Sequence, residues 1–274
     1  MILQKVVEST RRRVQAAKSS VPVAELQARI LERQKTGTFN TRQDFAFEEA
    51  LKKEGLSFIC EVKKASPSKG VIAPVFPYRE IALEYEKAGA QAISVLTEPE
   101  HFQGSDIYLK EISEAVSIPV LRKDFILDAY QIYEAKLLGA DAVLLICALL
   151  DTETLQEYLG ICDGLGLSAL VEAHSKAEIA SALEAGARII GVNNRNLKTF
   201  EVDIRNCLML RDLVPKEILY VAESGIQTPE EIALLERAGV DAVLLGEVLM
   251  RSADKKAMLA YLQSGAGLLA RQKR

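Results

Sequence analysis

The residues best suited to chemistry stand at the ends of short apolar runs along the 274-residue chain. They comprise two lysines, three glutamates, an asparagine, a serine and a glycine, namely Glu61, Lys63, Lys123, Glu172, Asn193, Glu223, Ser224 and Gly246. One charged strand end could equally serve only to solvate a rim, but so many convergent ends favour catalysis. Lysines and carboxylates gathered in one place perturb one another's pKa values, which suits proton transfer at neutral pH.

Other common kinds of chemistry find little support in the sequence. The cysteines are Cys60, Cys147, Cys162 and Cys207. They form no C-x-x-C pair, so we expect buried thiols rather than a zinc site or a disulfide framework. Only His101 and His174 are histidines, which disfavours a histidine-rich metal site or a Ser/His/Asp triad. His174 lies two residues after Glu172, but an exposed loop histidine is the favoured interpretation, and His101 is equally open.

The elements that must position these residues are marked by an internal repeat. Copies of a small-residue motif follow amphipathic stretches and precede runs rich in Val, Ile and Leu, and their glycines are Gly89, Gly139, Gly186 and Gly239. Each indicates a helix C-cap glycine that leads into a buried strand. The glycines lie about 50 residues apart, which is about two βα units, so the repeat marks every second strand.

The unmarked strands lie where the repeat requires them. Apolar runs that end in polar residues cover residues 58–62, 119–123, 167–172 and 218–223. Such strands, alternating with helices and hydrophobic almost throughout, predict a parallel sheet, and the regular period favours a closed (β/α)8 TIM barrel over an open sheet. A barrel of this kind needs about 250 residues, so we expect one domain over residues 1–274, with the barrel in residues 46–274.

Strand parity predicts which way the side chains point. On the first strand, Ile59, Glu61 and Lys63 share a face, and if Ile59 fills the barrel, the other two crown its mouth. Residues 121, 123 and 125 of the third strand follow the same rule. The residues of opposite parity should form structural ion pairs in the helix layer, and they are Lys64, Arg122 and Asp124.

Residues 1–45 precede the barrel and should add a helical extension to it. Apolar positions at helical spacing predict a helix over residues 2–18, and the sequence TGT at residues 36–38 indicates a turn. The basic run at residues 11–13 is interpreted as a solvated helix face rather than a patch for nucleic acid.

Loops after the last two strands predict a phosphate site. ESGI at residues 223–226 and LGE at residues 245–247 follow strands seven and eight, where TIM barrels commonly bind phosphate through backbone N–H groups at a short helix. Glycines there allow a phosphate to approach the backbone. The loop ASPSKG at residues 65–70 could by itself be only a turn.

Charge and hydropathy restrict the partners. The formal net charge of −4, with scattered Lys and Arg, lacks the broad cationic footprint of nucleic-acid binding. The longest apolar run, residues 142–150, is about half of a membrane span, and the N-terminus lacks the apolar core of a signal peptide. We expect a cytoplasmic protein that binds a small molecule; whether it is a monomer or a weak homodimer stays open.

The motifs resemble those of the indole-3-glycerol-phosphate synthase family nearly end to end. The matching segments are ILQKVV (2–7), ICEVKKASPSKG (59–70), LRKDFI (121–126), LVE (170–172), IGVNNRNL (190–197), VAESGI (221–226) and GE (246–247). The resemblance implies ring closure, decarboxylation and dehydration of 1-(2-carboxyphenylamino)-1-deoxyribulose 5-phosphate to indole-3-glycerol phosphate in tryptophan biosynthesis, with no metal or organic cofactor. Residues 45–50 match less well and bear on how the extension closes over the mouth.

The resemblance also implies roles for single residues. Lys123 is expected to be the general acid of ring closure, and Lys63 to pair with the substrate carboxylate. For dehydration, Glu172 is the expected base and Lys63 or Lys123 the acid, tuned by Glu61. The other expected positions are Asn193, Glu223 and Ser224 around the ribulose hydroxyls and the ring, Phe102 and Phe125 beside the aromatic portion, and Ser66, Arg195, Gly225, Gly246 and Glu247 around the phosphate.

Two other functions stay open at this point. A desolvated Lys63 or Lys123 could form a Schiff base in a phosphate-binding aldolase. A non-catalytic barrel that binds a sugar phosphate or serves as a scaffold would show a broken catalytic set, whereas Glu61, Lys63, Lys123 and Glu172 are all present.

Overall fold

The structure, a computed structural model, describes residues 2–39, 42–196 and 200–267. Its main sheet consists of β1 (Ser57–Val62), β4 (Ala92–Leu96), β5 (Val120–Lys123), β6 (Ala142–Ile146), β7 (Ser168–Ala173), β8 (Ile189–Asn193), β9 (Leu219–Glu223) and β10 (Ala242–Leu245). These strands form a closed parallel barrel in the order β1-β10-β9-β8-β7-β6-β5-β4, and β1 pairs with β4 to close it. The predicted (β/α)8 TIM barrel is confirmed.

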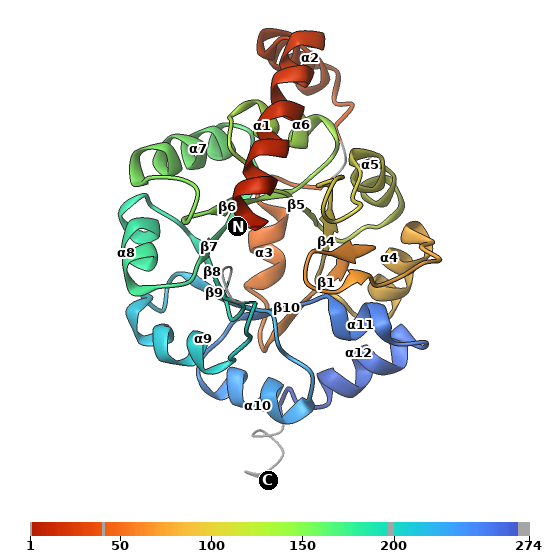
Figure 1. The fold of residues 1–274 in the computed structure, drawn as a ribbon, viewed down its shortest axis with the longest axis vertical. Coiled ribbons are helices and arrows are strands. Elements are labelled where there is room, and N and C mark those ends of the chain that lie inside the picture. The colour runs from red at the N-terminus through yellow and green to blue at the C-terminus, as the bar shows by residue number, and fades with distance from the viewer. Residues whose placement is uncertain (1, 40–41, 197–199, 268–274) are drawn as a thin grey trace.

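Helices surround the barrel as an outer ring (Figure 1). They are α4 (Tyr78–Lys87), α5 (Asp106–Ala115), α6 (Tyr130–Leu137), α7 (Thr152–Gly164), α8 (Lys176–Glu184), α9 (Arg205–Leu210), the 3-10 turn η1 (Arg211–Leu213), α10 (Pro229–Arg237), α11 (Glu247–Arg251) and α12 (Lys255–Gln263). The loop after β1 adds a small antiparallel hairpin of β2 (Ala65–Ser66) and β3 (Gly70–Val71).

The strand side chains alternate between the barrel interior and the helix layer. Ile59, Leu121, Leu170 and Val221 pack together inside the barrel, while residues of the other parity, such as Cys60, pack toward the helices. Because both faces are buried, the strands are hydrophobic almost throughout. The interior row continues past these residues into the polar strand ends, as parity predicted.

The repeated glycines sit where helices turn into strands. Gly89, Gly139, Gly186 and Gly239 follow α4, α6, α8 and α10 and have φ angles of 93°, 86°, 90° and 76°. This left-handed conformation is accessible to glycine at little cost and ends a helix abruptly. The repeat therefore records the αβ junctions.

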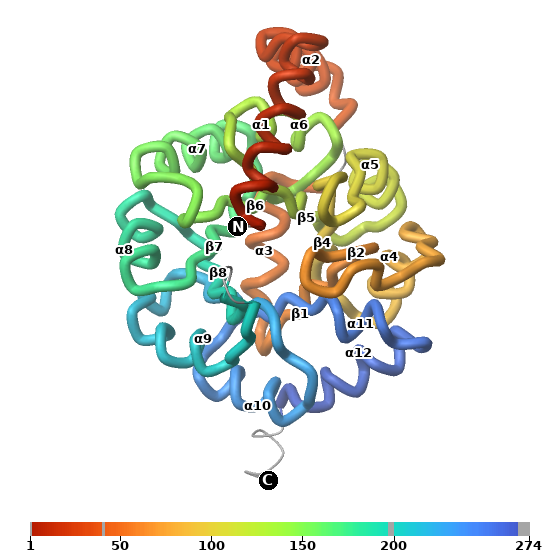
Figure 2. Tube along the Cα trace, in the orientation of Figure 1, coloured from red at the N-terminus to blue at the C-terminus, as the bar shows by residue number. Residues whose placement is uncertain are grey.

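The N-terminal extension forms two helices, α1 (Ile2–Ser20) and α2 (Val23–Thr36), and α2 ends at Gly37 in the predicted turn. In the tube view, α1 crosses the face of the barrel toward its centre, and α2 lies beyond the helix ring (Figure 2). Arg11 and Arg12 are exposed. The solvated interpretation is wrong for Arg13, whose guanidinium donates to both carboxylate oxygens of Asp124 at 2.7 and 2.9 Å because α1 lies against the barrel.

Residues 46–51 form α3 (Ala46–Leu51) at the N-terminal ends of the strands, opposite the mouth. Phe47 and Leu51 are fully buried among the interior residues of the barrel. The backbone N–H of Glu48 donates to the hydroxyl of Ser168, the first residue of β7, at 3.1 Å. The expectation that residues 45–50 help to close the mouth is wrong, because this segment plugs the opposite end.

The described residues contain neither a membrane-spanning helix nor a disulfide bond. None of the helices in this part of the chain has the length and apolarity that a membrane span requires. The cysteines are free; Cys60, Cys162 and Cys207 are buried as expected, while Cys147 is half-buried.

Candidate active site

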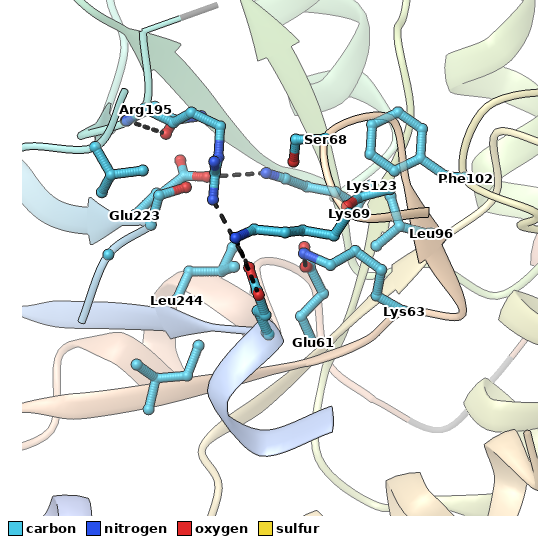
Figure 3. Close-up of a pocket in the computed structure, with 18 of the residues that line it drawn as sticks. Glu61, Lys63, Ser68, Lys69, Leu96, Phe102, Lys123, Arg195, Glu223 and Leu244 are labelled. Carbon is cyan, nitrogen blue, oxygen red and sulfur yellow. Dashed lines mark hydrogen bonds and ion pairs between the residues drawn. The ribbon is translucent and has the colours of Figure 1, made fainter. Parts of the chain in front are cut away.

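A cavity of about 760 Å³ opens at the C-terminal ends of the strands (Figure 3). Every residue that the sequence singled out for the site lines it: Glu61, Lys63, Ser66, Phe102, Lys123, Phe125, Glu172, Asn193, Arg195, Glu223, Ser224, Gly225, Gly246 and Glu247. They come from the ends of β1, β5, β7, β8, β9 and β10 and from the loops after them, except Phe102, which lies in the loop after β4. A barrel fold explains this convergence, because all its strands point to one mouth.

Glu61 and Lys63 form a buried ion pair at the end of β1. The Oε1 atom of Glu61 lies 2.5 Å from Nζ of Lys63, and the Glu61 side chain is almost inaccessible. Burial alone would raise the pKa of Glu61, but the charges of Lys63 and Lys123 outweigh it and lower that pKa. A side chain at Gly246 would collide with the Glu61 carboxylate, so the glycine makes room for this pair.

Lys123, at the end of β5, lies between two carboxylates of other strands. Its Nζ atom is 2.9 Å from Oε2 of Glu223 and 3.5 Å from Oε2 of Glu172. Burial acts to lower the pKa of Lys123, but the carboxylates of Glu223, Glu172 and Glu61 outweigh it and raise that pKa above its ordinary value. The surrounding carboxylates therefore favour the ammonium form of Lys123, which can donate a proton.

Glu223 is the least well compensated carboxylate of the site. Burial raises its pKa to about 7, against the charge of Lys123 and with the support of Glu172. Its Oε2 atom accepts from Lys123, while its buried Oε1 atom has no hydrogen-bond partner among the described residues. A side chain at Gly191 would collide with that Oε1 atom. The site thus holds an oxygen that is ready for a ligand hydroxyl.

The chain reverses direction after β9 through two left-handed residues. Ser224 has a φ of 69° and Gly225 a φ of 83°. A non-glycine residue in this region is strained, and such strain clusters at functional sites. The Asn194 side chain, directly after β8, holds this turn by donating to the Ser224 carbonyl at 3.1 Å. In the same loop after β8, the Asn193 side chain accepts from the Arg195 N–H at 3.0 Å.

Cations gather around one carboxylate at the side of the cavity formed by the loops after β1, β8 and β10. Glu247 lies 2.9 Å from Arg251, 3.8 Å from Lys69 and 4.0 Å from Arg195. Figure 3 shows Lys69 and Arg195 reaching toward each other over the cavity. Three cations with a single carboxylate leave net positive charge, which suits an anionic ligand.

The opposite wall is apolar. The Phe102 and Phe125 rings lie 5.9 Å apart with a 40° tilt, and Ile2, Leu3 and Val6 of α1 complete this part of the lining. The Phe102 loop is fixed by the Glu98 carboxylate, which accepts backbone N–H bonds from residues 100, 101 and 102 at 3.1, 2.7 and 3.0 Å. Two aromatic rings at this spacing can flank a planar aromatic ligand.

Of the residues with the opposite strand parity, Arg122 and Asp124 form the expected ion pairs, and Lys64 does not. The Arg122 guanidinium is fully buried and pairs with Asp106 at 3.0 Å and with Glu134 at 2.8 Å. Asp124 accepts from Arg13 and from the Thr97 hydroxyl. For Lys64 the expectation is wrong: it forms no ion pair with any residue in the described ranges, and its backbone carbonyl instead anchors the loop after β1.

His174 is not the exposed loop histidine that the sequence suggested. Only 15% of its side chain is exposed, because Glu172 lies on one side of the ring and Glu178 of α8 on the other. His174 does not line the cavity but sits behind Glu172. Parity placed it on the face of Glu172, and Glu178 stands only four residues later in the sequence, a local spacing that the sequence interpretation did not use.

Several lining residues escaped the sequence reasoning. Lys69 and Arg251 add charge, and Ile2, Leu3 and Val6 add apolar surface. Lys69 lies inside the loop at residues 65–70, from which only Ser66 was expected at the phosphate. Arg251 stands four residues after Glu247, a spacing that predicts a helical ion pair. The α1 residues carry no chemical signal at all, because only the packing of the extension brings them to the mouth.

Comparisons with known proteins identify the family. A family model described as "Indole-3-glycerol phosphate synthase" matches residues 3–262. The chain belongs to the indole-3-glycerol phosphate synthase family. A relative of that name from Ruminiclostridium cellulolyticum is 59% identical over 97% of this chain and 100% of its own length. Another from Lachnoclostridium phytofermentans is 55% identical over 96% of this chain and 99% of its own. As a member of this family, the chain is an enzyme, a carboxy-lyase of tryptophan biosynthesis.

Solved structures of low sequence identity share the fold alone. One is a 3-hexulose-6-phosphate synthase with a TM-score of 0.64 at 13% identity, covering 77% of this chain and 99% of its own. Another, the 3-hexulose-6-phosphate synthase of Salmonella typhimurium, has a TM-score of 0.63 at 17% identity and covers 77% of this chain and 98% of its own.

Within the described ranges, no group of three or more His, Cys, Asp and Glu side chains is arranged to hold a metal ion.

Proposed function

We propose that this member of the indole-3-glycerol phosphate synthase family works through Lys123, Lys63 and Glu172 as its proton-transfer and charge-stabilising groups. The reaction converts 1-(2-carboxyphenylamino)-1-deoxyribulose 5-phosphate to indole-3-glycerol phosphate, CO2 and water. The observation that carries the assignment is the Lys123 ammonium held between Glu223 and Glu172 over the cavity.

The substrate lies across the mouth, with its aromatic end at the phenylalanines and its phosphate at the cations. The carboxyphenyl ring packs beside Phe102 and Phe125, whose spacing supports this. When the phosphate binds, it replaces Glu247 as the ion-pair partner of Arg195 and Lys69. Ser66 and the backbone at Gly225 and Gly246 also contact the phosphate. Glu247 repels a phosphate directly, so its role is to hold these cations in place until the phosphate arrives.

Ring closure requires an acid at the ketone oxygen while the aromatic carbon attacks. Lys123 supplies that proton, since its raised pKa keeps it charged in a buried position. Lys63 pairs with the substrate carboxylate until CO2 leaves, and the ring carbon keeps the electron pair of the broken bond. Glu61 holds Lys63 at 2.5 Å for this contact.

Dehydration requires a base and an acid. Glu172 removes the proton from the carbon next to nitrogen, and Lys63 or Lys123 protonates the departing hydroxyl. Glu223, Asn193 and Ser224 orient the ribulose hydroxyls; the free Oε1 atom of Glu223 supports this role. No metal or organic cofactor takes part, and the partner is a small phosphorylated molecule rather than nucleic acid or a membrane. We also keep a cytoplasmic location, with monomer and weak homodimer as the alternatives.

The test is the appearance of indole fluorescence when the purified enzyme meets its substrate. Lys123→Ala should lower kcat by about 10²–10⁴-fold, the usual contribution of a general acid, while Lys53→Ala, an exposed lysine, should be unaffected. Full activity in Lys123→Ala would overturn the mechanism. Borohydride with substrate should trap no adduct on either site lysine; a trapped imine would instead support the aldolase.

A further inference from the structure

His174 connects Glu172 to the outside of the barrel. Its Nε2 atom lies 3.6 Å from Oε1 of Glu172, and its Nδ1 atom lies 3.3 Å from Oε2 of Glu178. The Nε2 atom is buried and has no hydrogen-bond partner within the described ranges. At 3.6 Å, this atom lies just beyond hydrogen-bond range of Glu172. The orphaned nitrogen thus faces the residue assigned as the base.

The ring is held from the helix side. The Oε2 atom of Glu178, in the first turn of α8, also accepts the backbone N–H of His174 at 2.7 Å, so it fixes both the ring and the strand end. The Glu178 side chain is 26% exposed. On the cavity side, Oε2 of Glu172 lies 3.5 Å from Nζ of Lys123. A continuous series of ionisable groups therefore runs from solvent through Glu178, His174 and Glu172 to Lys123.

The overall reaction needs such a connection, because it consumes one proton. Two protons go to the same oxygen, first as the ketone becomes a hydroxyl and then as the hydroxyl leaves as water. One proton is removed from carbon by Glu172, and the carboxylate leaves as neutral CO2. Glu172 can return its proton to Lys123, but the other proton must come from solvent in every turnover.

We propose that His174 is a positioning and proton-relay residue that recharges the acid of the site from solvent, through Glu178 on one side and Glu172 on the other. This role rests on the proposed part of Glu172 as the base. A proton that enters at Glu178 passes over the two ring nitrogens to Glu172 and then to Lys123, and no other reactant is needed. The relay can work while substrate or product covers the mouth.

The electrostatics around the ring support this role. Burial acts to lower the pKa of His174, but Glu178, Glu172 and Glu223 outweigh it and raise that pKa. Cys147, after β6, lies near the same pair, Glu172 and Glu178, and burial raises the pKa of this thiol to about 12, so it stays neutral. The neighbouring carboxylates therefore favour the protonated imidazole, the form that can pass a proton to Glu172.

The decisive variants separate positioning from relay. In His174→Gln, the amide can still donate to Glu172 but cannot pass a proton, so KM should stay near that of the wild type. We expect kcat to fall about tenfold, less than the ~10²–10⁴-fold loss of a general acid or base itself. The solvent deuterium isotope effect on kcat should rise, and added imidazole should restore the rate. A glutamine variant with wild-type kcat and isotope effect would overturn the relay.

A second pair of variants avoids any change to the ring. Glu178→Gln should show the same slower, isotope-sensitive kcat, whereas Glu184→Gln, the same substitution at the exposed end of α8, should match the wild type. Equal behaviour of these two variants contradicts the path. Glu172→Gln tells the two proposals apart: if it stays active, the assignment of the base fails, and if it is inactive while His174→Gln and Glu178→Gln are normal, only the relay fails.

Discussion

The two ends of the barrel treat buried charge in opposite ways. At the closed end, Glu48 accepts from Arg188 at 2.8 Å and from Lys52 at 2.9 Å, and Arg188 also pairs with Asp163. Although burial raises it, the pKa of Glu48 is lowered overall by these two cations. Phe47 of the same helix fills the interior below the strands. At this end, the buried carboxylate is therefore paired with cations, and the barrel interior is filled by side chains.

At the open end, carboxylates outnumber lysines and a cavity replaces the plug. Glu61, Glu172 and Glu223 share Lys63 and Lys123, and the pKa of Glu223 rises to about 7 because burial is not fully compensated. A substrate that brings its own groups can complete these interactions. The difference teaches that charge at one end maintains the fold, while charge at the other end is left reactive.

The largest effect should follow from Glu172→Gln at the open end. Without its base, the enzyme can still close the ring and release CO2 but cannot dehydrate the intermediate, so kcat for indole formation should fall about 10²–10⁴-fold. Rapid quenching should detect about one CO2 per active site without indole fluorescence. Loss of both signals together would instead place Glu172 in ring closure.

The next largest effects are expected from two phenylalanine truncations, one at each end of the barrel, which compare stability with substrate binding. Phe47→Ala leaves a void in the interior and should lower the free energy of unfolding by about 3–5 kcal/mol, with KM unchanged. Phe102→Ala, at the half-buried cavity wall, should raise KM and leave stability nearly intact. Urea unfolding and steady-state kinetics measure both. A large change in KM for Phe47→Ala would contradict the division of roles.

Much of the open end could be predicted because strand period and repeat spacing are local properties. Parity alone separated Lys123, which contacts Glu172 and Glu223 in the site, from Arg122 and Asp124, whose fully buried side chains form structural ion pairs. The αβ glycines fixed the number of strands, and a parallel barrel then forces their ends to converge.

Two of the errors concern contacts between distant segments. Arg13 contacts Asp124 because α1 packs on the barrel, and α3 enters the closed end because its apolar residues fit there. His174 was expected to be exposed, but Glu178, four residues later in the sequence, covers the ring. The errors at Arg13 and α3 depend on tertiary packing, which a single sequence pattern does not encode.

A smaller effect is expected from Glu48→Gln at the closed end. The neutral amide keeps the shape but loses the charge that pairs with Arg188 and Lys52, so the free energy of unfolding should fall by about 1–3 kcal/mol. Because the folded pKa of Glu48 is lowered, its contribution is present above the ordinary value of 4.5 and is lost as pH falls through the folded value. Unfolding curves at pH 8 should therefore differ more between variant and wild type than curves at pH 4. Activity at pH 8 should be unchanged.

The smallest expected effect is a gain in the free energy of unfolding, and it is expected for Glu223→Gln. The folded pKa of Glu223 is raised from 4.5 to about 7, so ionising this group costs stability as pH rises through that interval. The amide removes the cost, and the free energy of unfolding should increase by about 1 kcal/mol above pH 7, with no gain below pH 4. Since Glu223 also orients the ribulose hydroxyls in our mechanism, kcat/KM should fall in the same variant. A variant less stable than the wild type at pH 8 would mean that the open end is as well compensated as the closed one.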